Sequence, residues 1–243
     1  MKSGPAEILT NERIAEDTYE MILRTDIARE VRCGQFVQVQ IPGYFLRRPI
    51  SVHRILDDHT LSLIYKVVGD GTLALSQTAA GGILDLFGPL GNGFPVLDED
   101  VILIGGGVGV PPLAETAAQY RKHGRHVTAV LGFNNEASAF GADEFRSLGC
   151  DVIIATMDGS LGYKGTVIDA IRAAGLKPAT VLACGPVPML RAVAENYQGW
   201  ISLEARMACG IGACMGCVVK TPDGNSLRVC KDGPVFRTGE VIL

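Results

Sequence analysis

The sequence predicts an antiparallel β-barrel, a parallel α/β domain and a small cysteine-rich tail, in that order along the chain. Three observations predict this β + α/β architecture. Up to about residue 97, short segments of alternating apolar and polar residues are separated by turn signals. From residue 101, unbroken apolar runs alternate with helical stretches, and four of the seven cysteines lie between 209 and 230. We therefore expect units at residues 1–97, 98–199 and 200–243.

The composition excludes several classes of protein. The chain has 243 residues, 47% of them hydrophobic and 20% charged, with a net charge of −4, so it has enough apolar material for packed cores. Because no basic stripe is present, nucleic acid is not an expected partner. No apolar run approaches the roughly 18 residues of a membrane span, and acidic residues stand where a signal peptide would be apolar. We expect a cytoplasmic protein without membrane contact.

The first unit is expected to form a small barrel or sandwich. Apolar alternation predicts strands at 19–23, 36–41 and 61–67. Turn signals at 42–43, 57–58, 69–71 and 81–82 separate or follow them. The glycine- and proline-rich segment 88–95 is expected to be a loop or linker.

The second unit is expected to hold a parallel sheet. Apolar runs without alternation are typical of strands buried on both faces, and they occur at 101–104, 127–131, 152–155 and 181–183. Helices are expected between them at 112–123, 142–148, 167–174 and 187–196, the third with Thr166 as N-cap and Gly175 at its end. Residues 200–203 are expected to add a last strand before the tail.

The tail contains Cys209, Cys214, Cys217 and Cys230 in the spacing C-x4-C-x2-C-x12-C. This is the spacing of a plant-type 2Fe–2S cluster, and the glycines between the cysteines let amide groups point at the sulfurs. A zinc site is the first alternative, although zinc sites more often use two C-x2-C pairs or histidine, and no histidine lies in this tail. A reactive or disulfide role is the second alternative.

A glycine loop follows the first parallel strand and opens a helix. Gly105, Gly106, Gly107 and Gly109 would let a diphosphate approach the backbone. The loop does not fit the Rossmann fingerprint, because Val110 stands where that pattern needs glycine, and a tight structural turn is the alternative.

A second loop of the same kind favours the nucleotide-binding interpretation. Cys184, Gly185 and Pro186 also end a strand and open a helix, and both loops are expected at the carboxyl edge of the sheet. Asn134, Asn135 and Glu136 follow the second parallel strand, where they suit a ribose hydroxyl better than a 2′-phosphate, which favours NAD over NADP.

The barrel carries a polar motif of its own. Arg48, Pro49, Ile50 and Ser51 follow an apolar segment, and the turn at 69–72 offers amide donors and a hydroxyl. A solvated corner is the alternative for the arginines, but an arginine, a serine and a Gly-Thr turn on one barrel suit a flavin dinucleotide.

The order of these parts resembles the ferredoxin reductase superfamily, in which a flavin barrel precedes a pyridine-nucleotide domain. The Arg-Pro-Ile-Ser segment matches its Arg-x-Tyr-Ser flavin motif, residues 105–111 its first nucleotide loop, and Cys-Gly-Pro at 184–186 a further motif. Two features depart from the pattern: Ile50 replaces an aromatic residue, and the cysteine tail replaces a C-terminal aromatic residue.

The tail narrows the resemblance. Residues 203–217 and 229–236 are similar to the electron-transfer subunits of NAD-dependent (class 1B), two-subunit dihydroorotate dehydrogenases, and 88–94 and 156–160 fit as well. Small subunits of sulfide dehydrogenases or ferredoxin:NADP oxidoreductases are the alternative, but they usually have Asp in place of Cys209. A regulatory nucleotide-binding protein with a zinc knot is an alternative from another class.

The resemblance implies a set of cofactors and residues. It implies FAD, NAD and a 2Fe–2S cluster on this chain, with no catalytic side chain of its own. The partner would be an FMN-containing catalytic subunit that oxidises dihydroorotate to orotate in pyrimidine biosynthesis, in a heterotetramer with two copies of each chain. The four cysteines would bind the cluster. The cofactor-binding residues would be Arg48, Pro49, Ile50, Ser51, Tyr65, Lys66, Val67, Gly71, Thr72, Gly105, Gly106, Gly107, Gly109, Asp158, Cys184, Gly185 and Pro186.

Overall fold

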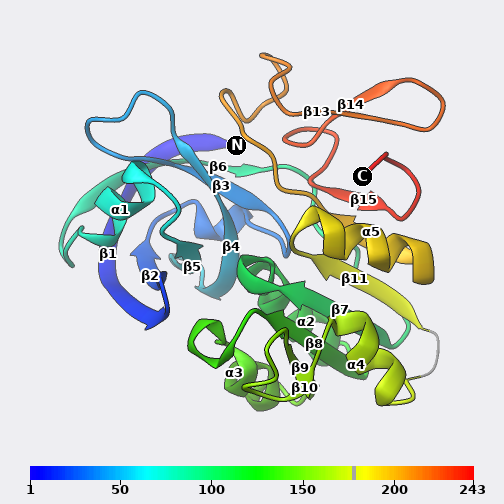
Figure 1. Cartoon of the computed structure of the whole chain (residues 1–243). Coiled ribbons are helices and arrows are strands. Elements are labelled where there is room, and N and C mark those ends of the chain that lie inside the picture. Colours follow the sequence, from blue (N-terminus) through cyan, green and yellow to red (C-terminus); the bar gives the residue numbers. More distant parts are fainter. Residues whose placement is uncertain (177–178) are drawn as a thin grey trace.

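The alternating segments of the first unit close into a six-stranded antiparallel barrel, in the strand order β1-β2-β5-β4-β3-β6 (Figure 1). The computed structural model describes residues 1–176 and 179–243. Met21 pairs with Leu63 and Leu23 with Leu61 across β2 and β5, and all four side chains are fully buried. The strands are β1 (Lys2–Ala15), β2 (Thr18–Arg24), β3 (Phe36–Gln40), β4 (Arg48–Asp57), β5 (Thr60–Lys66) and β6 (Ile83–Leu90).

Besides containing strands that were not predicted, such as β1, the barrel differs from the expectation in two segments. Residues 88–90, expected to belong to a loop or linker, are the end of β6, where Gly88 and Leu90 pair with other barrel strands. The expected turn at 69–72 is the start of helix α1 (Asp70–Ser76), which Thr72 caps through its hydroxyl. Strand β6 contains Gly88 and Pro89, which have low strand propensity, and α1 contains Gly71, which has low helix propensity. Strand pairing and packing within the barrel outweigh these low propensities.

The second unit forms a seven-stranded sheet with the order β10-β9-β8-β7-β11-β12-β15. The strands from β10 to β12 are parallel, as predicted for β7, β8, β9 and β11; β10 was not expected, and β15 joins the edge antiparallel. The strands are β7 (Val101–Gly106), β8 (Val127–Phe133), β9 (Asp151–Thr156), β10 (Tyr163–Lys164), β11 (Thr180–Cys184), β12 (Gly199–Ser202) and β15 (Val235–Arg237).

Helices cover both faces of this sheet. The helices are α2 (Pro111–Lys122), α3 (Ala142–Ser147), α4 (Val167–Ala173) and α5 (Val187–Asn196). On β7, Val101 and Leu103 pack in the core that contains α2 and α3, while Ile102 and Ile104 pack in the core that contains α4 and α5. This two-sided burial is the reason for the unbroken apolar runs. None of the helices in the described part of the chain is long and apolar enough to cross a membrane.

The cysteine-rich tail is tied to the second unit. Strands β13 (Val218–Lys220) and β14 (Ser226–Arg228) form a separate hairpin, but β12 and β15 lie in the large sheet. The expected boundary between 199 and 200 therefore falls inside β12. The division into three units stays a prediction.

A charged cluster joins the barrel to the second unit. Arg54 of β4 donates to Glu115 of α2 at 3.1 Å and to Glu144 of α3 at 2.8 Å. His53 is buried beside them, with Nδ1 3.1 Å from the carbonyl oxygen of Pro111 and Nε2 2.9 Å from Glu144. These contacts tie strand β4 of the barrel to helices α2 and α3 of the second unit through buried and partly buried charged groups.

Candidate functional site

The predicted flavin residues line a cleft of about 950 Å³ on the barrel side of the molecule. Neighbouring strands β4 and β5 place most of them there, and α1 contributes one more. The predicted residues in its lining are Arg48, Pro49, Ile50, Ser51, Tyr65, Lys66 and Thr72, together with Cys184 from the second unit.

Arg48 is held in place by its neighbours. Its guanidinium lies 4.7 Å from the ring centre of Tyr44 and donates to the carbonyl oxygen of Leu46. It also occupies the space that a side chain at Gly71 would need, so Gly71 supports Arg48 without lining the cleft. The arrangement leaves a fixed cation at the cleft, which suits a diphosphate.

Tyr65 and Thr72 already use their hydroxyls within the protein. Tyr65 donates to Asn11 at 2.8 Å, and burial raises the pKa of its phenol. The Thr72 oxygen accepts from the backbone N–H groups of Val68 and Gly69 at 2.9 and 3.2 Å. Both residues therefore contribute to the wall of the cleft, while their hydroxyls are already engaged in hydrogen bonds within the protein.

The sequence analysis missed the far wall of this cleft. Residues 203–207, between β12 and the first cluster cysteine, line it together with Ser202 at the end of β12, and Tyr44 and Phe45 of the β3–β4 loop line it from the barrel. Nothing in the local pattern of 203–207 signals such a role, because the contact depends on long-range packing. We call residues 203–208 the strap.

A second cleft, of about 740 Å³, lies at the carboxyl edge of the parallel sheet. Among the predicted nucleotide-binding residues, Gly106, Gly107 and Pro186 line it, and so does Asn134 from the segment after β8. The sequence analysis missed the polar residues Thr166, Asp169, Arg172 and Asn196 at this cleft.

The two glycine-containing loops pack against each other. A side chain at Gly109 would overlap the carbonyl group of Cys184, so this close approach requires glycine. Gly107 has φ of +53° and no atom within 4 Å of the position of a Cβ, so its outer side is open. Gly105, Gly109 and Gly185 thus position the loops without lining either cleft.

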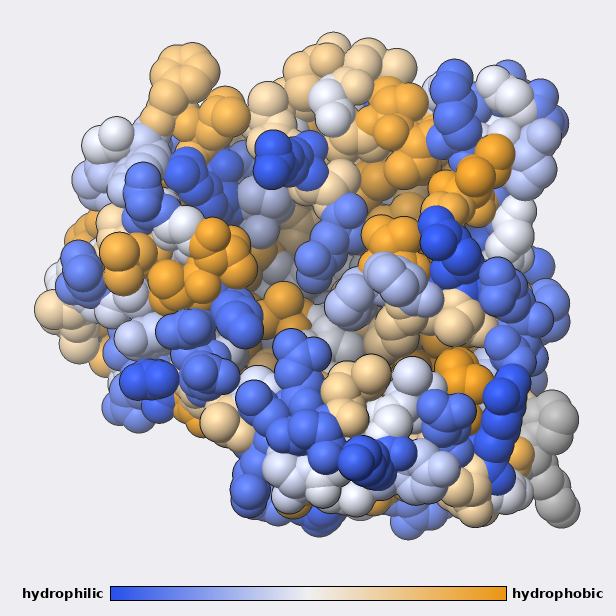
Figure 2. Space-filling model, viewed as in Figure 1, coloured by the Kyte–Doolittle hydropathy of each residue, from blue (hydrophilic) through white to orange (hydrophobic). Residues whose placement is uncertain are grey.

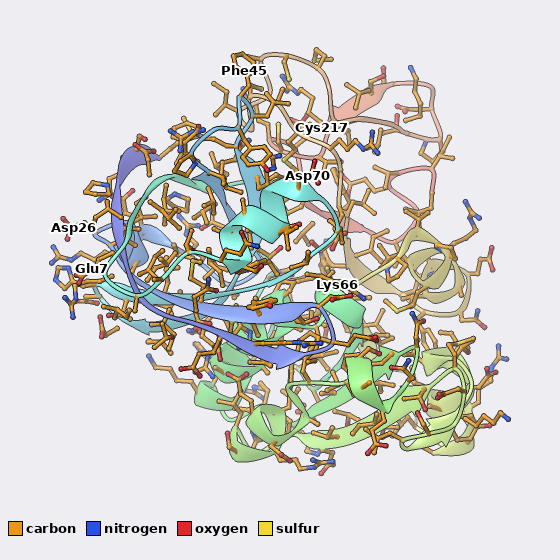
Figure 3. All side chains as sticks on the ribbon, turned by 60° about the vertical axis from the view of Figure 1, so that its left-hand side comes forward. Glu7, Asp26, Phe45, Lys66, Asp70 and Cys217 are labelled. Carbon is orange, nitrogen blue, oxygen red and sulfur yellow. The ribbon has the colours of Figure 1, made fainter. Side chains whose placement is uncertain are left out.

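The two clefts adjoin. Lys66 and Val108 line both of them, and Figure 3 shows Lys66 between the barrel and the α/β ribbon. Figure 2 shows the surface hollowed in the middle of this face. Two ligands in these clefts would therefore meet at one seam.

Some predicted residues lie away from both linings. Val67 and Asp158 line neither cleft, although Met157 next to Asp158 does. Asp158 accepts hydrogen bonds from the hydroxyl and N–H of Ser160 at 2.7 and 2.9 Å, and these bonds lower the pKa of its carboxyl. Glu136 also lies outside the lining, in a short turn after Asn135.

The cysteine loop directs backbone N–H groups at sulfur. The Cys209 sulfur accepts from Ile211, Ala213 and Cys214 at 3.3–3.4 Å, and the Cys230 sulfur accepts from Gly212 at 3.1 Å. Burial by itself raises the pKa of Cys209, but these donors outweigh it and lower the pKa to about 6.

Two other cysteines of the set are more enclosed than Cys209, whereas Cys214 is exposed. Cys217 and Cys230 are buried, and burial together with the neighbouring Cys217 sulfur raises the pKa of Cys230 to about 12. Among residues 1–176 and 179–243, no three His, Cys, Asp or Glu side chains are grouped to hold one metal ion. A Cys₄ 2Fe–2S cluster has two irons, and each iron needs only two cysteine ligands. Cysteine sulfurs that accept hydrogen bonds from backbone N–H groups, as in this loop, fit that cluster.

The remaining candidates have structural roles. Cys33 and Cys150 are buried, as expected for small hydrophobic residues. His123 and His126 bind separate partners, the carbonyl oxygen of Gln119 and the carboxylate of Asp151. His53 belongs to the interface cluster and lines neither cleft.

The barrel, the parallel sheet and the adjoining clefts define a ferredoxin reductase-like electron-transfer protein with an added cysteine-rich tail. A solved NADH-dependent reduced ferredoxin-NADP oxidoreductase, described for flavin-based electron bifurcation, is similar over 98% of this chain and 89% of its own, with TM-score 0.90 and 31% identity. The ferredoxin reductase of carbazole 1,9a-dioxygenase shares the fold over 80% of this chain and 64% of its own, with TM-score 0.70 and 23% identity.

Sequence comparisons identify the family. The family model for the iron-sulfur cluster binding domain of dihydroorotate dehydrogenase B matches residues 204–242. The dihydroorotate dehydrogenase B (NAD(+)) electron transfer subunit of Geobacillus kaustophilus (strain HTA426) is 46% identical over 95% of each chain. That of Fusobacterium nucleatum subsp. nucleatum is 41% identical over 99% of each chain. The chain belongs to the family of these electron transfer subunits.

These findings confirm the predicted fold class, the electron-transfer role and the iron–sulfur domain in the tail. They also agree with FAD and NAD as the further cofactors.

Proposed function

We propose that this chain binds FAD in the barrel cleft, NAD(H) in the cleft at the sheet edge and a 2Fe–2S cluster on its four tail cysteines. One observation carries the proposal: the two clefts meet at Lys66 and Val108, and the strap that lines the first cleft leads directly to Cys209. This continuity supports one route for electrons through a single chain.

In the barrel cleft, Arg48 would hold the FAD diphosphate, and Ser51 would lie near the ring. The fixed guanidinium of Arg48 supports the first role, and the position of Ser51 in the lining supports the second. Ile50 is 7% exposed in the lining, where it offers an apolar side chain in place of an aromatic one.

In the sheet-edge cleft, the open side of Gly107 would receive the dinucleotide diphosphate. Cys184 and Pro186 would border the nicotinamide, because Cys184 lines the barrel cleft and Pro186 the sheet-edge cleft. A flavin takes up two electrons as hydride and releases them singly, which is the conversion needed between NADH and a 2Fe–2S centre.

The partner is proposed to be the catalytic subunit that binds FMN and oxidises dihydroorotate to orotate, while NAD⁺ is reduced to NADH and a proton is released. We propose two copies of each chain, in the cytoplasm, where thiolate ligands stay reduced. Phe45, with 97% of its surface exposed, and Met215, with 52%, are apolar side chains of the flavin cleft and the cysteine loop. Figure 2 shows apolar groups along this upper side of the molecule, which supports docking there.

Purification of the tagged chain from its native cell tests this function. We expect an untagged partner that oxidises dihydroorotate, and NAD⁺ reduction that requires both chains. The mass of the complex gives the stoichiometry. A partner that oxidises sulfide or a ferredoxin instead of dihydroorotate would favour the alternative subunits, to which the fold is also similar.

A further inference from the structure

The peptide group between Gly212 and Ala213 forms hydrogen bonds at both ends, to a cysteine sulfur at its N–H and to a guanidinium at its carbonyl oxygen. The N–H of Ala213 donates to the sulfur of Cys209 at 3.3 Å. The carbonyl oxygen of the same peptide, on Gly212, accepts from Nη1 of Arg228 at 3.2 Å. Arg228 ends strand β14, so it reaches the loop from a neighbouring element.

The guanidinium of Arg228 is fixed by Asp232. Its Nε and Nη2 donate to the two oxygens of Asp232 at 2.9 and 3.1 Å, which leaves Nη1 for Gly212. The backbone N–H of Arg228 also donates to Asp232 at 2.8 Å, and the N–H of Asp232 donates back to the carbonyl oxygen of Arg228 at 2.8 Å. The turn that contains Cys230 and the guanidinium therefore form one rigid unit.

A cation on a peptide oxygen polarises the whole peptide group. The polarised N–H becomes a stronger donor, because hydrogen bonds in a chain strengthen one another where the local dielectric is low. Donors to ligand sulfur stabilise the more negative, reduced form of an iron–sulfur centre and so raise its reduction potential.

We propose that Arg228 is a positioning residue that raises the reduction potential of the cluster through the peptide between Gly212 and Ala213. This inference rests on the proposed assignment of the cluster to the four cysteines. Arg228 contacts none of the cysteine side chains by a hydrogen bond of its own in the described part of the chain, so its influence passes through the peptide and through its charge.

Two substitutions separate these two influences. Arg228→Lys keeps the positive charge, but the lysine side chain is one bond shorter and lacks the several N–H donors of a planar guanidinium. It therefore cannot bind Asp232 and Gly212 at the same time. Arg228→Gln removes both influences. Lys220→Gln is the matched control, because Lys220 lies in the same hairpin, carries the same charge and bonds to Ser226 away from the cysteine loop.

The experiment is a redox titration of the holoprotein, with the reduced cluster followed by electron paramagnetic resonance and its iron content measured. We expect Arg228→Gln to reduce the equilibrium constant for cluster reduction about tenfold, or about 59 mV for one electron. Arg228→Lys should give a lowered potential as well, and Lys220→Gln the wild-type potential, all with two irons per chain.

Three outcomes would overturn the proposal: an unchanged potential in Arg228→Gln, a wild-type potential in Arg228→Lys, or an equal decrease in Lys220→Gln. If Arg228→Gln does not retain its cluster, the reduction potential of Arg228→Lys tests the proposal instead. If the four tail cysteines do not bind the cluster, the result is different: a Cys209→Ser variant would then keep an unaltered cluster spectrum, with or without a substitution at Arg228.

Discussion

Lys66, at the end of β5, and Val108, in the turn after β7, lie together at the boundary between the two clefts and line both. One comes from the barrel and the other from the α/β unit, so the seam exists only because the two units are fixed against each other. Lys66 brings a positive charge to the seam, where the two proposed cofactors would approach each other.

Replacement of Lys66 by Met should therefore slow reduction of the flavin by NADH about tenfold or more. A hydrogen bond to a charged group contributes about 1.5–3 kcal/mol, and 1.36 kcal/mol corresponds to a factor of ten in rate. Stopped-flow absorbance of the flavin measures the step. Lys122→Met, at the exposed end of α2, is the control and should react like the wild type. An unchanged rate in Lys66→Met would remove the role assigned to the seam.

Loss of FAD is expected when Arg48 is replaced by Ala, because the variant lacks the cation that packs on the Tyr44 ring in the space left open by Gly71. Arg48→Lys should also bind FAD more weakly, since an ammonium cannot form bidentate bonds to a diphosphate. The flavin-to-protein ratio after gel filtration measures both. Arg24→Ala, which breaks only an exposed pair with Glu7, should retain FAD. Full retention of tightly bound FAD in Arg48→Ala would contradict the assignment.

Nucleotide access is tested at Gly107. Valine at this position should obstruct the cleft and slow flavin reduction by NADH, while reduction by dithionite is spared. Gly124→Val is a matched control for backbone strain, since Gly124 has φ of +74° and equally open surroundings but lies after α2, outside both cleft linings. Equal slowing in both variants would indicate strain alone. If NADPH proves the much better donor, the interpretation of Asn134 to Glu136 is wrong.

The sequence was sufficient for the parallel sheet but not for the walls of the clefts. Strands β7, β8 and β11 were predictable because each is buried on both faces, whereas the exposed two-residue strand β10 was not expected. The N-cap was predictable because the Thr166 oxygen accepts from the N–H of Asp169 at 3.2 Å within one helical turn. Strand β1 was not expected, since few of its side chains are buried and Lys2–Ala15 reads as a polar segment.

The strap was missed for a different reason. Gln38 Nε2 donates to the carbonyl oxygen of Ala208, 170 residues away in the chain, so no local pattern reports this contact. The cysteine spacing, in contrast, is a local pattern imposed by the chemistry of the loop. The interface cluster of His53, Arg54, Glu115 and Glu144 likewise joins three elements that are distant in sequence.

Glu144 should make the stability of the interface depend on pH. Burial raises the pKa of this carboxyl, but hydrogen bonds from His53 and Arg54 outweigh burial and lower it below the ordinary 4.5. The carboxylate therefore stabilises the fold fully above pH 4.5, and this contribution is lost as the pH falls through the lower folded-state pKa. Glu144→Gln should reduce the free energy of unfolding by about 1–2 kcal/mol at pH 7.

Thermal unfolding followed from pH 7 to pH 3.5 measures this effect. The difference in Tm between the wild type and Glu144→Gln should shrink at the acidic end. Asp143→Asn, which removes a fully exposed neighbouring carboxylate, should show little difference at any pH. A difference that stays constant with pH would show that the Glu144 charge does not stabilise the interface.

The cluster is expected to be the point at which electrons leave this chain. Cys217 is 5% exposed, and its sulfur accepts from the N–H of Cys230 at 3.4 Å, so Cys217→Ala removes an enclosed ligand and should abolish the cluster or shift its potential strongly. Reduction of the flavin by NADH should persist, because that step needs only the two clefts. NADH-linked turnover with the catalytic partner should fall to near zero.

Two measurements isolate the cause of that loss. Oxidation of dihydroorotate by the partner with an artificial acceptor should survive, which shows that the partner remains intact. Cys150→Ala removes a buried thiol outside the tail and should leave the cluster and the coupled turnover unchanged. If iron analysis verifies that Cys217→Ala holds no cluster and coupled turnover is nevertheless normal, electrons must leave directly from the flavin. The strap and the cysteine loop would then serve docking, and the role assigned to the four cysteines in electron transfer would be wrong.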